Sequence, residues 1–329
     1  MRRREFVTLA GGAAFALPSM LRAQTGGRIP LVVISFGTAA DDPFNLERAA
    51  AVKSGMTRLG WVEGSNIRYE LVFGDGSLDL MQARAEKILA AAPDVIVSSG
   101  TAAAIAFHKA TTTIPVVFAN VADPVAGGLV ASLSRPGGNM TGFTPFEYGI
   151  GGKWLQLLQQ VAPAITRATL LGDAFNPNFS GFWPPFESAA AAQKIEPAKI
   201  AAGSAEDIEK ALRALAEKQG GGIVVTASQF SITHRKLIFR LAEELKLPAV
   251  YWARFFAQTG GLLSYGPNFI KHHEQAAGYV DRILRGEKPG NLPVQFPTDY
   301  EMVLNAKTAG ALGLTISPLL LAQADEVIE

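Results

Sequence analysis

Residues 93–100 (PDVIVSSG) give the clearest indication of the fold. They form an apolar run that stops at small and polar residues, and a helical segment and a second apolar run, 114–119 (IPVVFA), follow. The second half repeats this order with 222–228 (GIVVTAS), a helical segment and 247–252 (LPAVYW). Such runs are typical of parallel strands that are buried because helices cover both faces of their sheet. The sequence therefore predicts an α/β protein with two doubly wound parallel-sheet lobes.

Two lobes of this design predict a binding site between them. Ligands of open α/β sheets lie outside the carboxyl ends of the strands. If the lobes face each other, segment 98–101 of the first lobe lies across a cleft from segment 226–228 of the second. The cleft is therefore the expected place for a ligand.

Strands and helices alternate through both halves of the chain. We expect the fourth helix of the first half to begin at Asp123-Pro124 and segment 175–185 to be a loop. The short segments 141–145, 265–267 and 296–298 are rich in Gly, Pro or Thr, and we expect them to cross between the lobes as a three-segment hinge. The predicted domains are an export signal at 1–24, an N-terminal lobe at 28–143 plus 267–296, and a C-terminal lobe at 144–266 plus 297–329.

Composition and the first residues indicate an exported protein. The chain has 329 residues, 48% of them hydrophobic, and a formal charge of +1, without the basic stripe of a nucleic-acid-binding surface. Residues 1–24 have a cationic start, an apolar stretch and small residues near Ala23, which predicts a Sec or twin-arginine (Tat) signal and a periplasmic location. A disordered cationic tail is the alternative. Because the chain has no cysteine, disulfides and a lipidated cysteine are excluded.

Polar residues follow the strands of the first lobe. Ser99, Gly100, Thr101 and Ala102 join a strand to a helix, where a Ser or Thr side chain caps the first turn and free amides attract an anion. Asp123 precedes Pro124, which is a helix-start signature, and its second carboxylate oxygen would accept a cationic ligand group. Helix capping without a ligand is the alternative at both junctions, and at Asp123 capping and ligand binding are compatible.

The second lobe offers a mixed polar and aromatic set. Aromatic side chains with one arginine suit a flat ligand, although aromatics near strand ends also serve in the core. Phe175, Phe179 and Trp183 form either the lip of the cleft or the packing of a loop. The candidate ligand-binding residues of this lobe are Thr226, Ser228, Gln229, Trp252, Arg254 and Tyr265.

Catalytic and cofactor sites are not expected. The four histidines occur in unrelated places, are expected at the surface, and include an adjacent pair, His272 and His273, that would point about 100° apart on a helix. Neither a nucleophile elbow nor a phosphate-binding glycine loop follows a predicted strand. We therefore expect no enzyme activity, no cofactor and no metal.

Short motifs spread over nearly the whole chain are together specific for one family, although no single motif is. These segments are 2–6 (RRREF), 59–64 (LGWVEG), 92–96 (APDVI), 114–118 (IPVVF), 123–125 (DPV), 133–142 (LSRPGGNMTG), 152–155 (GKWL), 260–266 (GGLLSYG) and 309–314 (AGALGL). In them the chain resembles the ABC-transporter substrate-binding family whose better-known members bind tryptophan and related amino acids. The resemblance implies the type I periplasmic binding protein fold.

This resemblance implies a receptor that closes on a small molecule and delivers it to a membrane permease driven by an ATPase. From the polar and aromatic residues described above we expect an aromatic or carboxylate-bearing solute. We expect a monomer that binds no nucleic acid. The family's cleft residues correspond here to Ser35, Phe36, Gly37, the residues from Ser99 to Ala102, the Asp123 turn, and Thr226 to Gln229.

One departure concerns the ligand. Amino-acid-binding relatives tend to carry an acidic residue in the segment that corresponds to 226–229, and this chain has none there. Asp123 is then the obvious partner for an ammonium group. An exported enzyme or a ligand-sensing module on the same fold is the alternative function.

Overall fold

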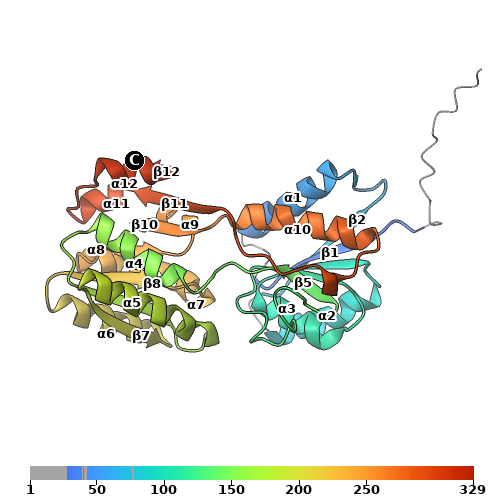
Figure 1. Ribbon diagram of the computed structural model, residues 1–329, viewed down its shortest axis with the longest axis horizontal. Helices are drawn as coiled ribbons and strands as arrows, with labels where there is room; N and C mark the ends of the chain where they lie inside the picture. The colour runs from blue at the N-terminus through green and yellow to red at the C-terminus, as the bar shows by residue number, and fades with distance from the viewer. Residues whose placement is uncertain (1–27, 39, 41–42, 76–77) are drawn as a thin grey trace, which may run out of the picture.

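The computed structural model describes residues 28–38, 40, 43–75 and 78–329, and in it two lobes lie side by side along the long axis of the molecule (Figure 1). The export signal expected at 1–24 falls outside the described residues. Within the described ranges, no helix is both long enough and apolar enough to cross a bilayer.

The first lobe is built on a five-stranded parallel sheet in the order β2-β1-β3-β4-β5. Val32 and Val33, neighbours on β1, point into two separate cores on opposite faces of this sheet. Helices α1 and α10 cover one face, and α2 and α3 cover the other. The elements are β1 (Leu31–Phe36), α1 (Pro43–Arg58), β2 (Arg68–Phe73), α2 (Leu78–Ala90), β3 (Val95–Ser99), α3 (Thr101–Ala110), β4 (Val116–Ala119), β5 (Met140–Phe143) and α10 (Phe269–Leu284).

The second lobe has a seven-stranded sheet in the order β12-β11-β10-β9-β8-β6-β7, in which only the β10–β11 pair is antiparallel. Its strands are β6 (Arg167–Asp173), β7 (Glu196–Ala202), β8 (Gly221–Val225), β9 (Ala249–Tyr251), β10 (Leu263–Pro267), β11 (Tyr300–Asn305) and β12 (Glu326–Ile328). Its helices are α4 (Ile150–Val161), η1 (Pro177–Phe182), α5 (Trp183–Gln193), α6 (Ala205–Ala216), α7 (Gln229–Thr233), α8 (Arg235–Glu244), α9 (Arg254–Gln258), α11 (Ala306–Ala311) and α12 (Pro318–Gln323).

The chain passes between the two sheets three times: after β5, after β10, and between η2 (Pro289–Asn291) and β11. Helix α10, orange in Figure 1, therefore packs on the blue α1 although β10, immediately before it, belongs to the other sheet. The first and third passages run together, since the Thr144 amide donates to the Gln295 carbonyl at 2.9 Å.

Two local predictions were wrong. The chain after Asp123-Pro124 forms turns up to Leu129 and no helix, because Asp123 has a φ of 42° and the Gly127-Gly128 pair favours a turn. Segment 175–185 is not a plain loop. Asn176 caps η1 with its side chain, Pro177 occupies the first turn of η1, and α5 follows directly.

Candidate functional site

A cleft of about 560 Å³ lies between the lobes, within the size range of pockets that hold small ligands. Its first-lobe wall comes from the ends of β1, β3 and β4 and from α1 and the start of α3, and its second-lobe wall from the residues after β6, β8 and β9. Among the residues predicted for a site, those that line this cleft are Gly37, Ser99, Gly100, Thr101, Ala102, Ser228 and Trp252.

Three other predicted residues are buried beside the cleft in the cores of the lobes. Ser35 has no exposed surface, and Phe36 stacks on Phe73 with 5.8 Å between ring centroids. Thr226 is 1% exposed, and its hydroxyl donates to the Leu171 carbonyl at 3.2 Å. These side chains support the walls of the cleft from behind.

Arg254 and Tyr265 lie on the β10–β11 side of the second lobe. The Arg254 guanidinium forms ion pairs with Glu301 at 3.3 Å and Glu326 at 2.7 Å. Tyr265 stacks on Tyr300 with 5.4 Å between ring centroids. Strand β11 supplies Tyr300 and Glu301 and strand β12 supplies Glu326, and both Arg254 and Tyr265 lie outside the cleft lining.

Asp123 and Gln229 lie next to cleft residues. The Asp123 carboxylate accepts from the Ala126 amide at 3.0 Å and from the Tyr148 hydroxyl at 3.3 Å, outside the cleft lining. Gln229 is the first residue of α7, directly after the cleft residue Ser228. Ser228 itself caps α7, because its hydroxyl accepts from the Ser231 amide at 3.0 Å.

The start of α3 differs from the expected capped junction. Gly100 occupies the N-cap position with a φ of 92°, a conformation that favours glycine, and glycine has no side chain with which to cap the helix. The first-turn residues Thr101 and Ala102 line the cleft, so the positive end of the α3 dipole faces it. Ser99 does not cap the helix; its hydroxyl lies 3.1 Å from His273 Nε2.

The prediction of surface histidines was wrong for His272 and His273, which are 2% and 0% exposed. Both lie in the first turns of α10, on the face that packs against the first-lobe sheet. Burial lowers the pKa of His272 to about 4, and burial together with the positive charge of Arg48 lowers the pKa of His273 to about 3. Across the described ranges, no group of His, Cys, Asp and Glu has the arrangement of a metal site.

Sequence reasoning missed two charged residues of the cleft, Arg48 and Asp173. Arg48 comes from α1 in the first lobe, and Asp173 ends β6 in the second lobe. The Asp173 carboxylate accepts from the Phe175 amide at 2.9 Å, which fixes its orientation. Ser99 was selected by the strand-end rule, which states that ligands of open α/β sheets lie outside the carboxyl ends of the strands, and the same rule applies to Asp173. Arg48 lies within a helix, so only the tertiary structure places it in the cleft.

Aromatic side chains cover the part of the cleft next to the passages between the lobes. Phe146 follows the first passage between the lobes, and its ring lies edge-on to Phe182, Trp252 and Phe269, with centroids 6.2, 5.9 and 6.3 Å apart. All four line the cleft. Phe175, 81% exposed, lies at its rim. The cleft thus combines a broad apolar surface with charged groups of opposite sign.

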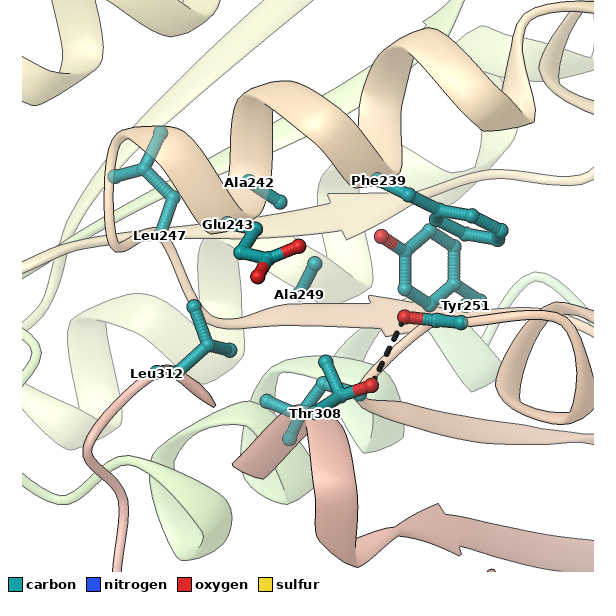
Figure 2. Close-up of a pocket in the computed structure, with 10 residues that line it drawn as sticks. Phe239, Ala242, Glu243, Leu247, Ala249, Tyr251, Thr308 and Leu312 are labelled. Carbon is teal, nitrogen blue, oxygen red and sulfur yellow. Dashed lines mark hydrogen bonds between the residues drawn. The ribbon is translucent and has the colours of Figure 1, made fainter. Parts of the chain in front are cut away.

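A second cavity of about 20 Å³ lies inside the second lobe, beneath α8 and beside α11 (Figure 2). Leu247 and Leu312 lie at one end of it and Phe239 and Tyr251 at the other, while Thr308 donates to the Gly260 carbonyl at 3.1 Å. This volume holds about one water molecule, so it is a packing feature and not a ligand site.

Residues 40–328 match the family of ABC transporter substrate binding proteins. The chain belongs to this family. A tyrosine-binding protein of Clostridioides difficile (strain R20291) is 24% identical over 255 residues, which are 78% of this chain and 73% of that protein.

Two solved structures share the fold. A conserved domain protein from Vibrio cholerae O1 biovar eltor has a TM-score of 0.81 and 26% identity, and the match covers 91% of this chain and 100% of that one. An ABC domain from Streptococcus pneumonia, solved in complex with L-Trp, has a TM-score of 0.81 and 20% identity over 92% of this chain and 100% of that one. The substrate-binding protein has the type I periplasmic binding protein fold that its sequence predicts.

Proposed function

We propose that this substrate-binding protein captures an α-amino acid with an aromatic or large apolar side chain. The observation that carries the proposal is the pairing of Arg48 and the amino end of α3 on one wall of the cleft with Asp173 on the opposite wall. A free amino acid carries a carboxylate and an ammonium group that would engage these two walls. The named ligands of the relatives, tyrosine and L-Trp, support the same class.

Asp173 supplies the cleft carboxylate that segment 226–229 lacks. That segment lacks the acidic residue that relatives tend to carry, and Asp123 is engaged by the Ala126 amide and the Tyr148 hydroxyl outside the cleft lining. Asp173 reaches the cleft from the end of β6, a strand of the same sheet. The carboxylate for an ammonium group therefore comes from a neighbouring strand.

Binding in this cleft would be coupled to hinge closure. A ligand held by Arg48 on one wall and Asp173 on the other stabilises the conformation in which both contacts are made, and it shifts the population only by its better contacts there. The aromatic side chains around Phe146 would cover the apolar part of the ligand. The closed, loaded protein would then dock on the permease of an ABC importer in the periplasm, after export by the predicted 1–24 signal.

A receptor fits the site better than an exported enzyme does. Ser99 and His273 have the spacing of a nucleophile and its base, but a general base works best when its pKa lies near the working pH. Burial lowers the pKa of His273 to about 3, which makes the imidazole a weak base at neutral pH. A sensing role would use the same site, and ligand-dependent uptake by a permease and ATPase pair distinguishes transport from sensing.

Calorimetric titration of the purified protein with L-tryptophan, L-tyrosine, L-phenylalanine and L-leucine tests the proposal. We expect a dissociation constant in the micromolar range, about −8 kcal/mol, for at least one aromatic amino acid. Sugars and nucleobases serve as controls. Binding of a sugar with no response to any amino acid would refute the proposed ligand class.

A further inference from the structure

The side chain of His273 connects α10 to the end of β3 at the cleft through two hydrogen bonds. His273 Nδ1 lies 2.7 Å from the Phe269 carbonyl oxygen, within α10, and Nε2 lies 3.1 Å from Ser99 Oγ at the end of β3. The imidazole has no exposed surface, and Ser99 is 6% exposed and lines the cleft. His273 therefore contacts Ser99 from the protein interior, and a ligand would contact Ser99 from the cleft.

The positions of the protons follow from the chemistry of the partners. A carbonyl oxygen only accepts hydrogen bonds, so Nδ1 must carry the proton that points at Phe269. A neutral imidazole has one N–H, so Nε2 is an acceptor. The Ser99 hydroxyl must then donate its only hydrogen to Nε2, and lone pairs of Ser99 Oγ remain for a group in the cleft.

We propose that His273 is a positioning residue that makes Ser99 an acceptor-only contact in the cleft, so that the site selects ligands with a hydrogen-bond donor at this point. This inference rests on the proposed function, and it identifies the donor as the ammonium group of the amino acid. Ser99 precedes Gly100, the N-cap residue of α3, and the carboxylate would lie at this end of the helix. In an α-amino acid the ammonium and the carboxylate share one carbon, so both fall within reach of this segment.

The surroundings of His273 keep the imidazole neutral. Phe36 of β1 stacks against its ring with 6.4 Å between centroids. The charged and titratable groups that act on it are Arg48 of α1 and His272 of α10, and both, together with burial, lower the pKa of His273. A protonated imidazole would turn Nε2 into a donor and reverse the direction of the bond to Ser99.

Long-range ¹H–¹⁵N correlation spectra of the full chain without ligand test the proton positions. We expect the Nδ1–H tautomer for His273, unchanged from pH 5 to 8, and assigned by comparison with a His273→Gln variant. An Nε2–H tautomer, or protonation within this pH range, would overturn the inference. This measurement needs no ligand, so it decides the inference independently of the proposed function.

Binding of L-tryptophan and of its deaminated analogue, indole-3-propionate, tests the selectivity. Ser99→Ala should weaken L-tryptophan binding about tenfold or more, as for loss of a hydrogen bond to a charged group, and should leave the affinity for indole-3-propionate within about twofold. Equal weakening of both compounds would mean that Ser99 contacts the carboxylate as a donor, which overturns the inference.

Ser98→Ala is the matched control. Ser98 is the neighbouring residue on β3, has no exposed surface, and its hydroxyl finds no hydrogen-bond partner among the described residues. The same substitution there should leave both affinities unchanged. If the wild-type protein binds neither compound, the proposed ligand class is wrong, and the tautomer spectrum still decides the role of His273.

Discussion

The Tyr148 hydroxyl lies 3.3 Å from Asp123 Oδ2 in the first lobe and 3.2 Å from Asn178 Oδ1 in the second. Burial and the nearby Asp123 charge raise the pKa of Tyr148 to about 12, so the phenol stays a donor at neutral pH. A phenol has one hydrogen and therefore donates to one of these oxygens at a time. Tyr148 thus provides a polar link between the lobes beside the cleft.

Loss of this link should destabilise the protein. Tyr148→Phe should lower the free energy of unfolding by about 1 kcal/mol, because it removes a hydrogen bond to a carboxylate or amide oxygen. Urea denaturation measures the change. Tyr69→Phe is the control, since the Tyr69 hydroxyl is buried without a partner in the described part of the chain, and its removal should cost nothing. Equal effects of both substitutions would contradict the link.

Asp173→Asn tests the carboxylate of the second-lobe wall. We expect L-tryptophan affinity to fall at least about tenfold, because an amide offers the ammonium no charge. Stability should change little, since asparagine keeps an oxygen that accepts from the Phe175 amide. Calorimetry and thermal melting measure the two effects. Asp79→Asn, which removes one exposed charge from α2 outside the cleft, should leave affinity unchanged. A wild-type affinity in Asp173→Asn would exclude Asp173 from the ammonium site.

Trp252 should report ligand binding by fluorescence. Its ring lines the cleft at 8% exposure, and its Nε1 donates to Ser231 Oγ at 3.1 Å. A tyrosine or leucine titration, which adds no indole, should change the emission in the wild-type protein, and Trp252→Phe should remove most of the change. Trp61→Phe is the control, because that indole donates to Asp281 on α10 outside the cleft. A signal that survives in Trp252→Phe would argue against contact with this ring.

Two glycines in corresponding places of the two lobes should tolerate no side chain. A Cβ at Gly142 on β5 would lie 1.9 Å from the Phe118 carbonyl oxygen, and one at Gly266 on β10 would lie 1.8 Å from the Trp252 carbonyl oxygen. Alanine at either site should lower the free energy of unfolding by about 2–4 kcal/mol or prevent folding, since backbone must move.

Gly278→Ala on α10 is the matched control for these glycines. A Cβ there meets no atom within 4 Å, so alanine should stabilise the helix by up to about 1 kcal/mol. Chemical denaturation compares the three variants. Tolerance of alanine at Gly142 or Gly266 would mean that the strands beside the passages are spaced differently.

The buried histidine pair predicts loss of stability in mild acid. In the unfolded chain each histidine binds a proton below about pH 6.5. In the folded chain burial lowers the pKa of His272 to about 4 and the pKa of His273 to about 3. The unfolded state therefore binds more protons between pH 6.5 and 4, so the stabilisation present above pH 6.5 is lost as the pH falls through this window.

Each histidine contributes about 1.4 kcal/mol per pH unit to this slope well below pH 6.5. His272→Gln removes one titrating group and should flatten the slope between pH 5.5 and 4.5 by that amount. Denaturation across this pH range measures it. An unchanged slope would mean that His272 is already protonated in the folded protein.

The sequence predicts the two-lobe fold well because each buried strand is a local signal. Strand β3 ends at Ser99 and strand β8 ends at Val225, within the predicted run 222–228, and parallel strands place these ends at the cleft. The family resemblance supplied the same cleft segments. The buried runs and the family motifs are both continuous stretches of sequence, so they can be recognised without the tertiary structure.

The polar details of the site depend on contacts between distant segments. Arg48 reaches the cleft from a helix, and His273 reaches Ser99 across 174 residues of chain. Arg254 looked like a cleft cation in the sequence, yet Glu301 and Glu326, which β11 and β12 bring alongside, bind it elsewhere. The strand-end rule gives a position for a residue but not the partner of its side chain.

A crystal structure of the protein with L-tryptophan or L-tyrosine bound would show how the cleft holds an amino acid. We expect one amino acid between the lobes, with its carboxylate toward Arg48 and the start of α3, its ammonium toward Ser99 and Asp173, and its side chain against Phe146 and Trp252. A ligand held on an outer surface, or in the cleft with its ammonium away from both Ser99 and Asp173, would contradict it.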